Sequence, residues 1–345
     1  MSVRENTVNI AIYGIFHLFV DLCCAAIVYS YVGKIDLEQL ITLVLLYNGV
    51  AFGLQPVIGL FADKTGRARN YAITGCAILA FSFCFLKIPT AAVFIAALGN
   101  AFYHIGGGSV ALKLSGGKSL LSGLFVAPGA IGLFLGAFLW KLPSFEIFWL
   151  IGLMVGGVLI ISMLDEPEEV KQTFKFDGSK LLLVLTALLI LISVGIRSFV
   201  GLSYGFSRNN VFELMFLFIF AVAAGKAFGG WLADKFGMFN TSVTALLVSL
   251  PLLYYAHSPV FEIIGMFLFN FTMPVTLTAL ADMMPDKKGF AFGLTTLFLL
   301  IGALPPILYR ITISHNLIFT VIVSVSIIVT AVGLKIFEMN KKADV

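Results

Sequence analysis

The sequence predicts an all-α membrane protein in which twelve transmembrane helices form two pseudo-symmetric six-helix bundles. Three observations predict this fold class: the composition, a series of apolar stretches, and an internal repeat. Of the 345 residues, 60% are hydrophobic and 12% are charged, and the mean hydropathy is +1.03. Soluble proteins carry about 25% charged residues. The composition therefore excludes a water-soluble protein.

Twelve apolar stretches are long enough to cross a bilayer, because a spanning helix needs about 20 apolar residues. The first half of the chain contains six of them, over residues 8–32, 40–62, 71–86, 91–112, 120–140 and 145–163. The second half contains the other six, over residues 181–206, 211–233, 243–256, 260–281, 290–308 and 317–337. The remaining residues form short loops, which leave no room for a sizeable soluble domain.

The longest polar stretch separates the two halves. It carries six charged side chains, Asp165, Glu166, Glu168, Glu169, Lys171 and Lys175. Such a charged run between apolar segments is typical of a linker. We therefore predict an N-terminal bundle over residues 1–164, a cytoplasmic linker over residues 165–180 and a C-terminal bundle over residues 181–345.

The basic residues indicate the orientation in the membrane. Of the 22 Lys and Arg residues, fifteen fall on the side of the predicted spans that holds both termini. Five fall on the opposite side: Lys34, Lys87, Lys141, Arg208 and Arg310. The last two, Arg197 and Lys226, fall within spans. Basic residues near span ends favour the cytoplasmic side. We therefore expect a multi-pass protein of the cell (inner or plasma) membrane with both termini in the cytoplasm.

The internal repeat is visible in one motif. The segment from Gly59 to Gly66, GLFADKTG, recurs from Gly230 to Gly237 as GWLADKFG, at an offset of 171 residues. Each copy follows the second span of its half. A shorter echo at offset 170 pairs Gly123-Leu124 with Gly293-Leu294. Two parallel six-span repeats are a known transporter architecture, with the substrate path between the repeats near the bilayer midplane.

The first copy of this motif, extended through Arg69, resembles the signature between the second and third spans of the major facilitator superfamily. The resemblance covers the whole chain in span count and repeat, and it implies transport by alternating access. An Asp at a helix end, followed by a tight turn and basic residues, can bridge neighbouring helix ends. We predict a gating motif made of Gly59, Asp63, Lys64, Gly66, Arg67, Asp234 and Lys235. The alternative is that the basic residues only anchor the inner face of the membrane.

Within the superfamily, three segments resemble the fosmidomycin resistance branch of drug exporters. They are His17 with Asp21 in the first span, Phe102-Tyr-His104 in the fourth, and Ile196-Arg197-Ser198 in the seventh. The resemblance implies export of a drug or small solute. Uptake of a small organic anion, proton-coupled or facilitated, stays open as the alternative direction.

His17 and Asp21 form the predicted proton-coupling pair. They are four residues apart and therefore lie on one face of the first span, with Asp21 about 20 Å along the helix from Val8. A carboxylate at this depth favours taking up a proton unless a cation is near. The alternative is a permanently hydrogen-bonded Asp that serves helix packing.

The predicted substrate-binding residues are polar groups at similar depths: Arg197, His104, Lys226, Asn100 and Gln55. Arg197 lies about 25 Å along the seventh span, and Lys226 lies about 12 Å inside the inner boundary. Gln55 is the counterpart of Lys226 in the repeat. Two cations against the single carboxylate Asp21 favour an anionic or zwitterionic substrate. The alternatives are snorkelling or packing for the cations and a buried structural role for His104.

The predicted function is secondary active transport by alternating access, as proton-coupled export (antiport) of a small anionic or zwitterionic solute or drug. A non-transporting membrane sensor is the remote alternative. The sequence contains no nucleophile elbow, phosphate-binding loop or metal-spaced His/Cys cluster, so we expect neither an enzyme nor a cofactor or metal. The expected partners are a small-molecule substrate, protons and the lipid bilayer. We expect a monomer that binds no nucleic acid.

Overall fold

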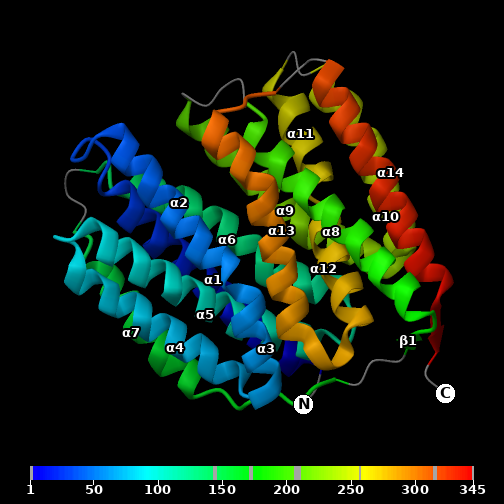
Figure 1. Ribbon diagram of the computed structural model, residues 1–345, viewed down its shortest axis with the longest axis horizontal. Helices are drawn as coiled ribbons and strands as arrows, with labels where there is room; N and C mark the ends of the chain where they lie inside the picture. Colours follow the sequence, from blue (N-terminus) through cyan, green and yellow to red (C-terminus); the bar gives the residue numbers. More distant parts are fainter. Residues whose placement is uncertain are drawn as a thin grey trace.

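The computed structural model describes residues 3–142, 146–170, 174–205, 211–255, 258–313 and 317–343. These residues form two helical bundles joined by the polar linker (Figure 1). The bundles converge at the end that carries the linker and both chain ends, and they diverge toward the opposite end. We term these the linker end and the open end. The arrangement confirms the predicted all-α, twelve-helix fold.

Each predicted span has a helical counterpart. The first bundle contains α1 (Val3–Tyr29), α2 (Leu37–Gly53), α3 (Gln55–Thr65), α4 (Ala68–Ser82), η1 (Phe83–Phe85), α5 (Pro89–Ser115), α6 (Ser119–Leu139) and α7 (Trp149–Ser162). The second contains α8 (Lys180–Ser203), α9 (Phe212–Phe236), α10 (Met238–Tyr254), α11 (Pro259–Phe269), α12 (Thr272–Met283), η2 (Pro285–Lys287), α13 (Lys288–Tyr309) and α14 (Leu317–Met339). The span ends predicted at residues 145, 206 and 256 lie outside the described residues.

Ten helical segments of the described chain are long and apolar enough to cross a membrane. Two shorter apolar helices, α7 and α10, stand where the sixth and ninth spans were predicted. Figure 1 places these two helices on opposite outer flanks of the pair of bundles. The segments that border the interface between the bundles are all among the longer ones.

Two of the predicted spans are interrupted by a local break, which the sequence analysis did not predict. The second span breaks at Leu54, where Pro56 has no N–H to donate to the preceding turn. The side-chain amide of Gln55 donates to Ala51 O across this break, at 2.6 Å. The tenth span breaks at Asn270, whose Nδ2 donates to Met266 O at 2.9 Å. A polar side chain thus bonds a main-chain carbonyl at each break, as lipid surroundings require.

The linker contains a short strand that the sequence did not predict. Strand β1 (Phe174–Phe176) pairs antiparallel with β2 (Lys341–Ala343), which follows the last helix. Asp177 and Lys342, both exposed, form an ion pair beside this ladder. The Lys342 ammonium holds the pKa of Asp177 below its ordinary value. The ladder fastens the linker to the C-terminal segment.

Glycines bring the two bundles into backbone contact at the linker end. Gly59 in α3 lies against Gly289 in α13, and Gly230 in α9 lies against Ser119 at the start of α6. A Cβ atom at Gly59 or Gly230 would overlap a main-chain carbonyl of the other bundle. Small residues at helix interfaces permit such approach in membranes. Because the two glycines occupy equivalent motif positions, the repeat builds the same contact twice.

We expect Gly230→Ala to push the bundles apart at the linker end. Overpacking costs about 1–3 kcal/mol, so the population closed at the linker end should fall by roughly five- to 150-fold relative to the open form. Spin-label distances between the linker ends of α6 and α9 measure this population. The matched control is Gly152→Ala in α7, where no atom lies within 4 Å of an added Cβ. Identical distance distributions for Gly230→Ala and the parent would refute the contact as a constraint.

Candidate functional site

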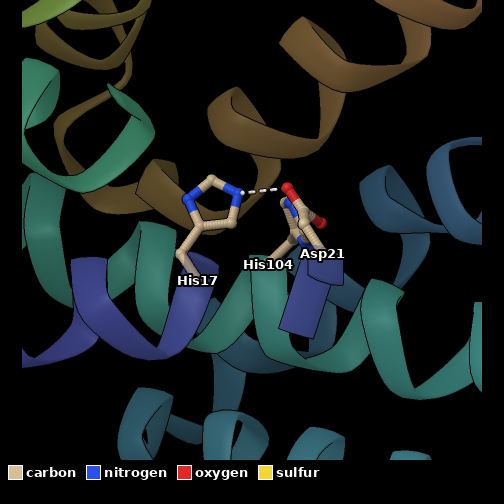
Figure 2. A group of neighbouring side chains, drawn as sticks. All are labelled: His17, Asp21 and His104. Carbon is tan, nitrogen blue, oxygen red and sulfur yellow. Dashed lines mark ion pairs between the residues drawn. The ribbon is translucent and has the colours of Figure 1, made fainter. Parts of the chain in front are cut away.

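Three polar side chains of α1 and α5 converge on the carboxylate of Asp21, and Figure 2 shows the two imidazoles among them. His17 Nε2 lies 3.2 Å from Asp21 Oδ2, and His104 Nε2 lies 3.6 Å from Asp21 Oδ1. Asn100 Nδ2 donates to Asp21 Oδ1 at 3.0 Å. All four side chains are buried. We term His17, Asp21, Asn100 and His104 the Asp21 cluster.

The hydrogen bonds of the two imidazoles define a place for a proton. His17 Nδ1 lies 2.8 Å from Phe125 O, and His104 Nδ1 lies 3.0 Å from Asn100 O. A main-chain carbonyl only accepts, so each Nδ1 carries the ring hydrogen. Each Nε2 of a neutral ring would then point a lone pair at the Asp21 carboxylate. The lone pair and the carboxylate repel each other. One added proton, on Nε2 or on the carboxylate, would allow a hydrogen bond between them.

The gap between these groups is kept free by a glycine of α6. A Cβ atom at Gly129 would lie 2.5 Å from Asp21 Oδ2 and 2.6 Å from His17 Nε2. The ligand atoms of His17, Asp21 and His104 lie within 4.8 Å of one another, so these residues could also hold a metal ion. Structural zinc sites use four protein ligands, however. Three ligands leave one coordination position open, and an imidazole whose Nδ1 bonds a main-chain carbonyl can serve a metal ion or a proton alike.

Arg197 in α8 and Lys226 in α9 form a second group, termed the cation pair. The Arg197 side chain is buried, and its Nη1 donates to Thr276 Oγ1 at 3.1 Å and approaches Thr272 Oγ1 at 3.4 Å. Its Nη2 is buried without a hydrogen-bond partner in the described part of the chain. Lys226 Nζ donates to Val126 O in α6 at 3.4 Å and lies within electrostatic range of both Arg197 and Asp21.

The cation pair has the chemistry of an anion-binding site. Neither cation forms an ion pair within the described residues. A guanidinium presents a planar fork of donors that suits carboxylate, phosphate and phosphonate groups. An uncompensated cation inside a membrane costs several kcal/mol. A bound anion would remove this cost and would satisfy the free Nη2 donor.

The structure divides the predicted substrate-binding residues into three groups. His104 and Asn100 contact Asp21, so they belong with the predicted proton pair. Arg197 and Lys226 lie within electrostatic range of each other. Gln55 is buried and donates to Ala51 O at the break between α2 and α3. Sequence reasoning missed the threonines of α12 and the Phe125 carbonyl, which carry no charge or motif.

The two motif aspartates latch the bundles together at the linker end. Asp63 accepts from Gly289 N and Phe290 N of α13, both at 2.8 Å. Asp234 accepts from Ser119 N at 2.7 Å and Leu120 N at 3.0 Å, at the start of α6. Each carboxylate thus caps a helix of the other bundle, where free N–H groups and the helix dipole favour negative charge.

The other residues of the predicted gating motif have different surroundings. Gly66 ends α3 with φ 71°, a left-handed conformation that favours glycine. Lys64 and Arg67 are exposed. Lys235 Nζ lies over the rings of Trp231 and Phe236, at 5.5 and 5.3 Å from their centroids. Arg69, which ends the extended first copy of the motif, contacts Glu166 of the linker and the Leu164 carbonyl.

A further latch residue, Lys288, was missed from the sequence. It is buried at the start of α13, and its Nζ contacts Glu169 Oε1 of the linker at 2.8 Å and donates to Leu112 O of α5 at 3.2 Å. It therefore joins the second bundle, the linker and the first bundle. The 170-residue offset of the repeat pairs Lys288 with Lys118. A comparison of the two halves at this offset could therefore have identified Lys288.

Comparison with known proteins identifies the family. The sequence pattern of the Major Facilitator Superfamily matches residues 8–306. The chain belongs to the Major Facilitator Superfamily. Members of this superfamily are transporters rather than enzymes, and they bind small-molecule substrates. The chain is therefore a multi-pass membrane transporter, and the resemblance found in its sequence is confirmed.

Individual superfamily members are similar to the chain at low identity. The fosmidomycin resistance protein of Escherichia coli is 24% identical over 280 residues, which cover 70% of this chain and 69% of that protein. The structure of the E. coli fucose:proton symporter FucP matches with a TM-score of 0.66 at 11% identity, over 99% of this chain and 100% of that one. The human organic anion transporter MFSD10 (TETRAN) matches with a TM-score of 0.64 at 12% identity, over 99% of both chains. The structural matches show a shared fold.

We expect Asp63→Ala to favour forms that are open at the linker end. The substitution removes two charge-assisted hydrogen bonds, each worth about 1.5–3 kcal/mol, so the equilibrium between closed and open forms should shift at least about tenfold. Turnover should slow more than substrate binding weakens. Spin-label distances between the bundles measure the shift, and Asp177→Ala is the control because Asp177 pairs with Lys342 outside the latch. Unchanged inter-bundle distances in Asp63→Ala would rule out the latch.

Proposed function

We propose that this transporter is proton-coupled and exports a small anionic or zwitterionic solute or drug by alternating access. The observation that carries the proposal is the Nη2 atom of Arg197, which is buried without a hydrogen-bond partner among the described residues. It belongs to a cation pair within electrostatic range of a carboxylate cluster whose hydrogen bonds accommodate an added proton. A non-transporting sensor would produce no solute flux in proteoliposomes, which separates it from this proposal.

Electrostatics links the two sites. In the empty protein, the Asp21 carboxylate offsets part of the charge of Lys226, which lies within its electrostatic range. An anion that binds Arg197 and Lys226 takes over this role and leaves the Asp21 cluster with less positive surroundings. The carboxylate then favours a proton, because negative charge is costly in low-dielectric surroundings. Occupancy of the anion site therefore changes the proton affinity of the Asp21 cluster.

Alternating access would use the latches at the linker end. With Asp63 and Asp234 on the helix N-termini of α13 and α6, the bundles are closed at that end. Opening requires both carboxylates to leave these sites together with the Lys288–Glu169 pair. Because both bundles belong to one chain, a monomer suffices. The excess of basic residues at the linker end supports a cytoplasmic position for both termini.

Two directions of transport are candidates. Export by antiport is supported by the similarity to the fosmidomycin resistance protein. Proton-linked uptake is favoured by a different observation, the shared electrostatic range of Lys226, Arg197 and Asp21, because it promotes binding of anion and proton together. Solute flux in proteoliposomes of known orientation, with the pH gradient imposed in either direction, decides between them.

We expect Asp21→Asn to abolish transport driven by a pH gradient while the protein stays folded. The amide keeps the shape of the carboxylate but cannot exchange a proton. Exchange of labelled for unlabelled solute without a gradient should continue. Asp177→Asn, which alters an exposed carboxylate outside the membrane segments, should transport like the parent. Gradient-driven flux that persists unchanged in Asp21→Asn would show that the proton site lies elsewhere.

We expect Arg197→Gln and Lys226→Gln each to weaken the binding of an anionic ligand about tenfold or more, which corresponds to roughly 1.4 kcal/mol. Methylphosphonate is a suitable first probe because it carries the charge with almost no apolar surface. Calorimetry on the purified protein measures the affinity, and Lys34→Gln controls for loss of an exposed positive charge. The cation pair belongs to helix packing instead if both variants bind the anion normally or if a lipophilic cation proves to be the substrate.

A further inference from the structure

An apolar cleft of about 590 Å³ lies between the two bundles, bordered mainly by α1, α2, α8 and α13. This volume is typical of a small-molecule site. Within the described residues the cleft lining includes no charged side chain, and its polar groups are Asn48, Ser198 and two tyrosines. The remaining lining is aliphatic or aromatic, with one cysteine. We term it the apolar cleft.

The apolar cleft occupies one side of the interface between the bundles. It reaches Tyr29 at the end of α1 and Leu202 near the end of α8, toward the open end. Elsewhere along the interface, α6 and α9 are packed together by phenylalanines. The ring centroids of Phe138 and Phe212 lie 4.5 Å apart, and those of Phe134 and Phe216 lie 6.1 Å apart. The apolar cleft therefore lies on the side of the interface where α2 and α13 face each other (Figure 1).

The deep end of the apolar cleft adjoins the Asp21 cluster, and one lining residue is the sequence neighbour of Arg197. Cys24 lines the cleft, and its Sγ lies 3.8 Å from the Asn100 amide that also donates to Asp21. Phe52, another lining residue, meets the ring of His104 edge-on with 6.4 Å between centroids. Ser198 lines the cleft directly after Arg197 in α8. The apolar cleft thus extends from the Asp21 cluster toward the open end.

We infer that the transported solute is an amphipathic organic anion, with its acidic group on Arg197 and Lys226 and an apolar chain in the apolar cleft. The inference rests on the proposed function and adds the substrate class. A small hydrophilic anion would find few hydrogen-bond partners in this lining, whereas an apolar chain gains affinity by leaving water. The gain corresponds to about fourfold in affinity per buried methylene.

A chain-length series tests the inference directly. The full-length protein in nanodiscs of zwitterionic lipid is titrated with methyl-, butyl- and octylphosphonate, and the dissociation constants are measured by calorimetry. Affinity should rise about fourfold per methylene from methyl to butyl and should level off where the chain outgrows the cleft. The n-alkanols of the same length should bind at least about tenfold more weakly, because they lack the charge that the cation pair recognises.

Two variants fill the apolar cleft from different helices. Ala303→Phe in α13 and Val44→Phe in α2 should each abolish the dependence on chain length while methylphosphonate binds as in the parent. Using both guards against a variant that fails to fold. The control is Val332→Phe on the exposed face of α14, where the side chain is 44% exposed; it should keep the full dependence.

The outcomes separate this inference from the proposed function. If methylphosphonate binds through Arg197 but affinity does not depend on chain length, the amphipathic substrate is wrong and the anion site stands. A chain-length effect that survives in both cleft-filling variants reflects partition into the lipid and also overturns the inference. Alkanols that bind as tightly as the phosphonates identify the cleft as a site for lipid chains only. If no phosphonate binds, or Arg197→Gln binds normally, the proposed anion transport itself fails.

Discussion

The free-energy cost of placing a charge inside a lipid bilayer determines how the buried polar side chains of this transporter are arranged. Asp21 is buried in α1, where a lone carboxylate would be unstable. The structure surrounds it with two imidazoles and one amide from α1 and α5, and α6 contributes the Phe125 carbonyl and the space beside Gly129. The charges of Arg197 and Lys226 are less well compensated, because neither side chain forms an ion pair within the described chain. This difference between the two groups supports the proposal that one is a proton site and the other an anion site.

The internal repeat connects this centre to the movement of the bundles. Asp63 and Asp234 occupy equivalent positions, and each accepts from two main-chain N–H groups of the opposite bundle. Gly59 and Gly230, four residues before them, permit the backbone contact that these hydrogen bonds need. The duplicated sequence thus produces two equivalent joints at one end of the interface. The rocking motion that we propose would break both joints together, because both lie at the same end of the interface.

The sequence predicted the features that lipid imposes directly. The number of spans follows from hydropathy and from the length of helix needed to cross a bilayer. Features that depend on tertiary packing could not be predicted in this way. His104 is 83 residues from Asp21 in the chain, and no periodicity indicates that α5 turns this ring toward α1. The breaks at Leu54 and Asn270 follow from local proline and amide chemistry, which a hydropathy pattern does not register.

The central claim is that anion binding at Arg197 and Lys226 changes the proton occupancy of the Asp21 cluster. The most direct test is to count the protons taken up or released when an anion binds to the purified protein in a weakly buffered solution. The account predicts proton uptake in the parent that disappears in Asp21→Asn, because a bound anion makes the Asp21 carboxylate favour a proton. Proton release on anion binding would indicate antiport and would contradict this electrostatic link. Anion binding without any proton exchange across the pH range would contradict the account.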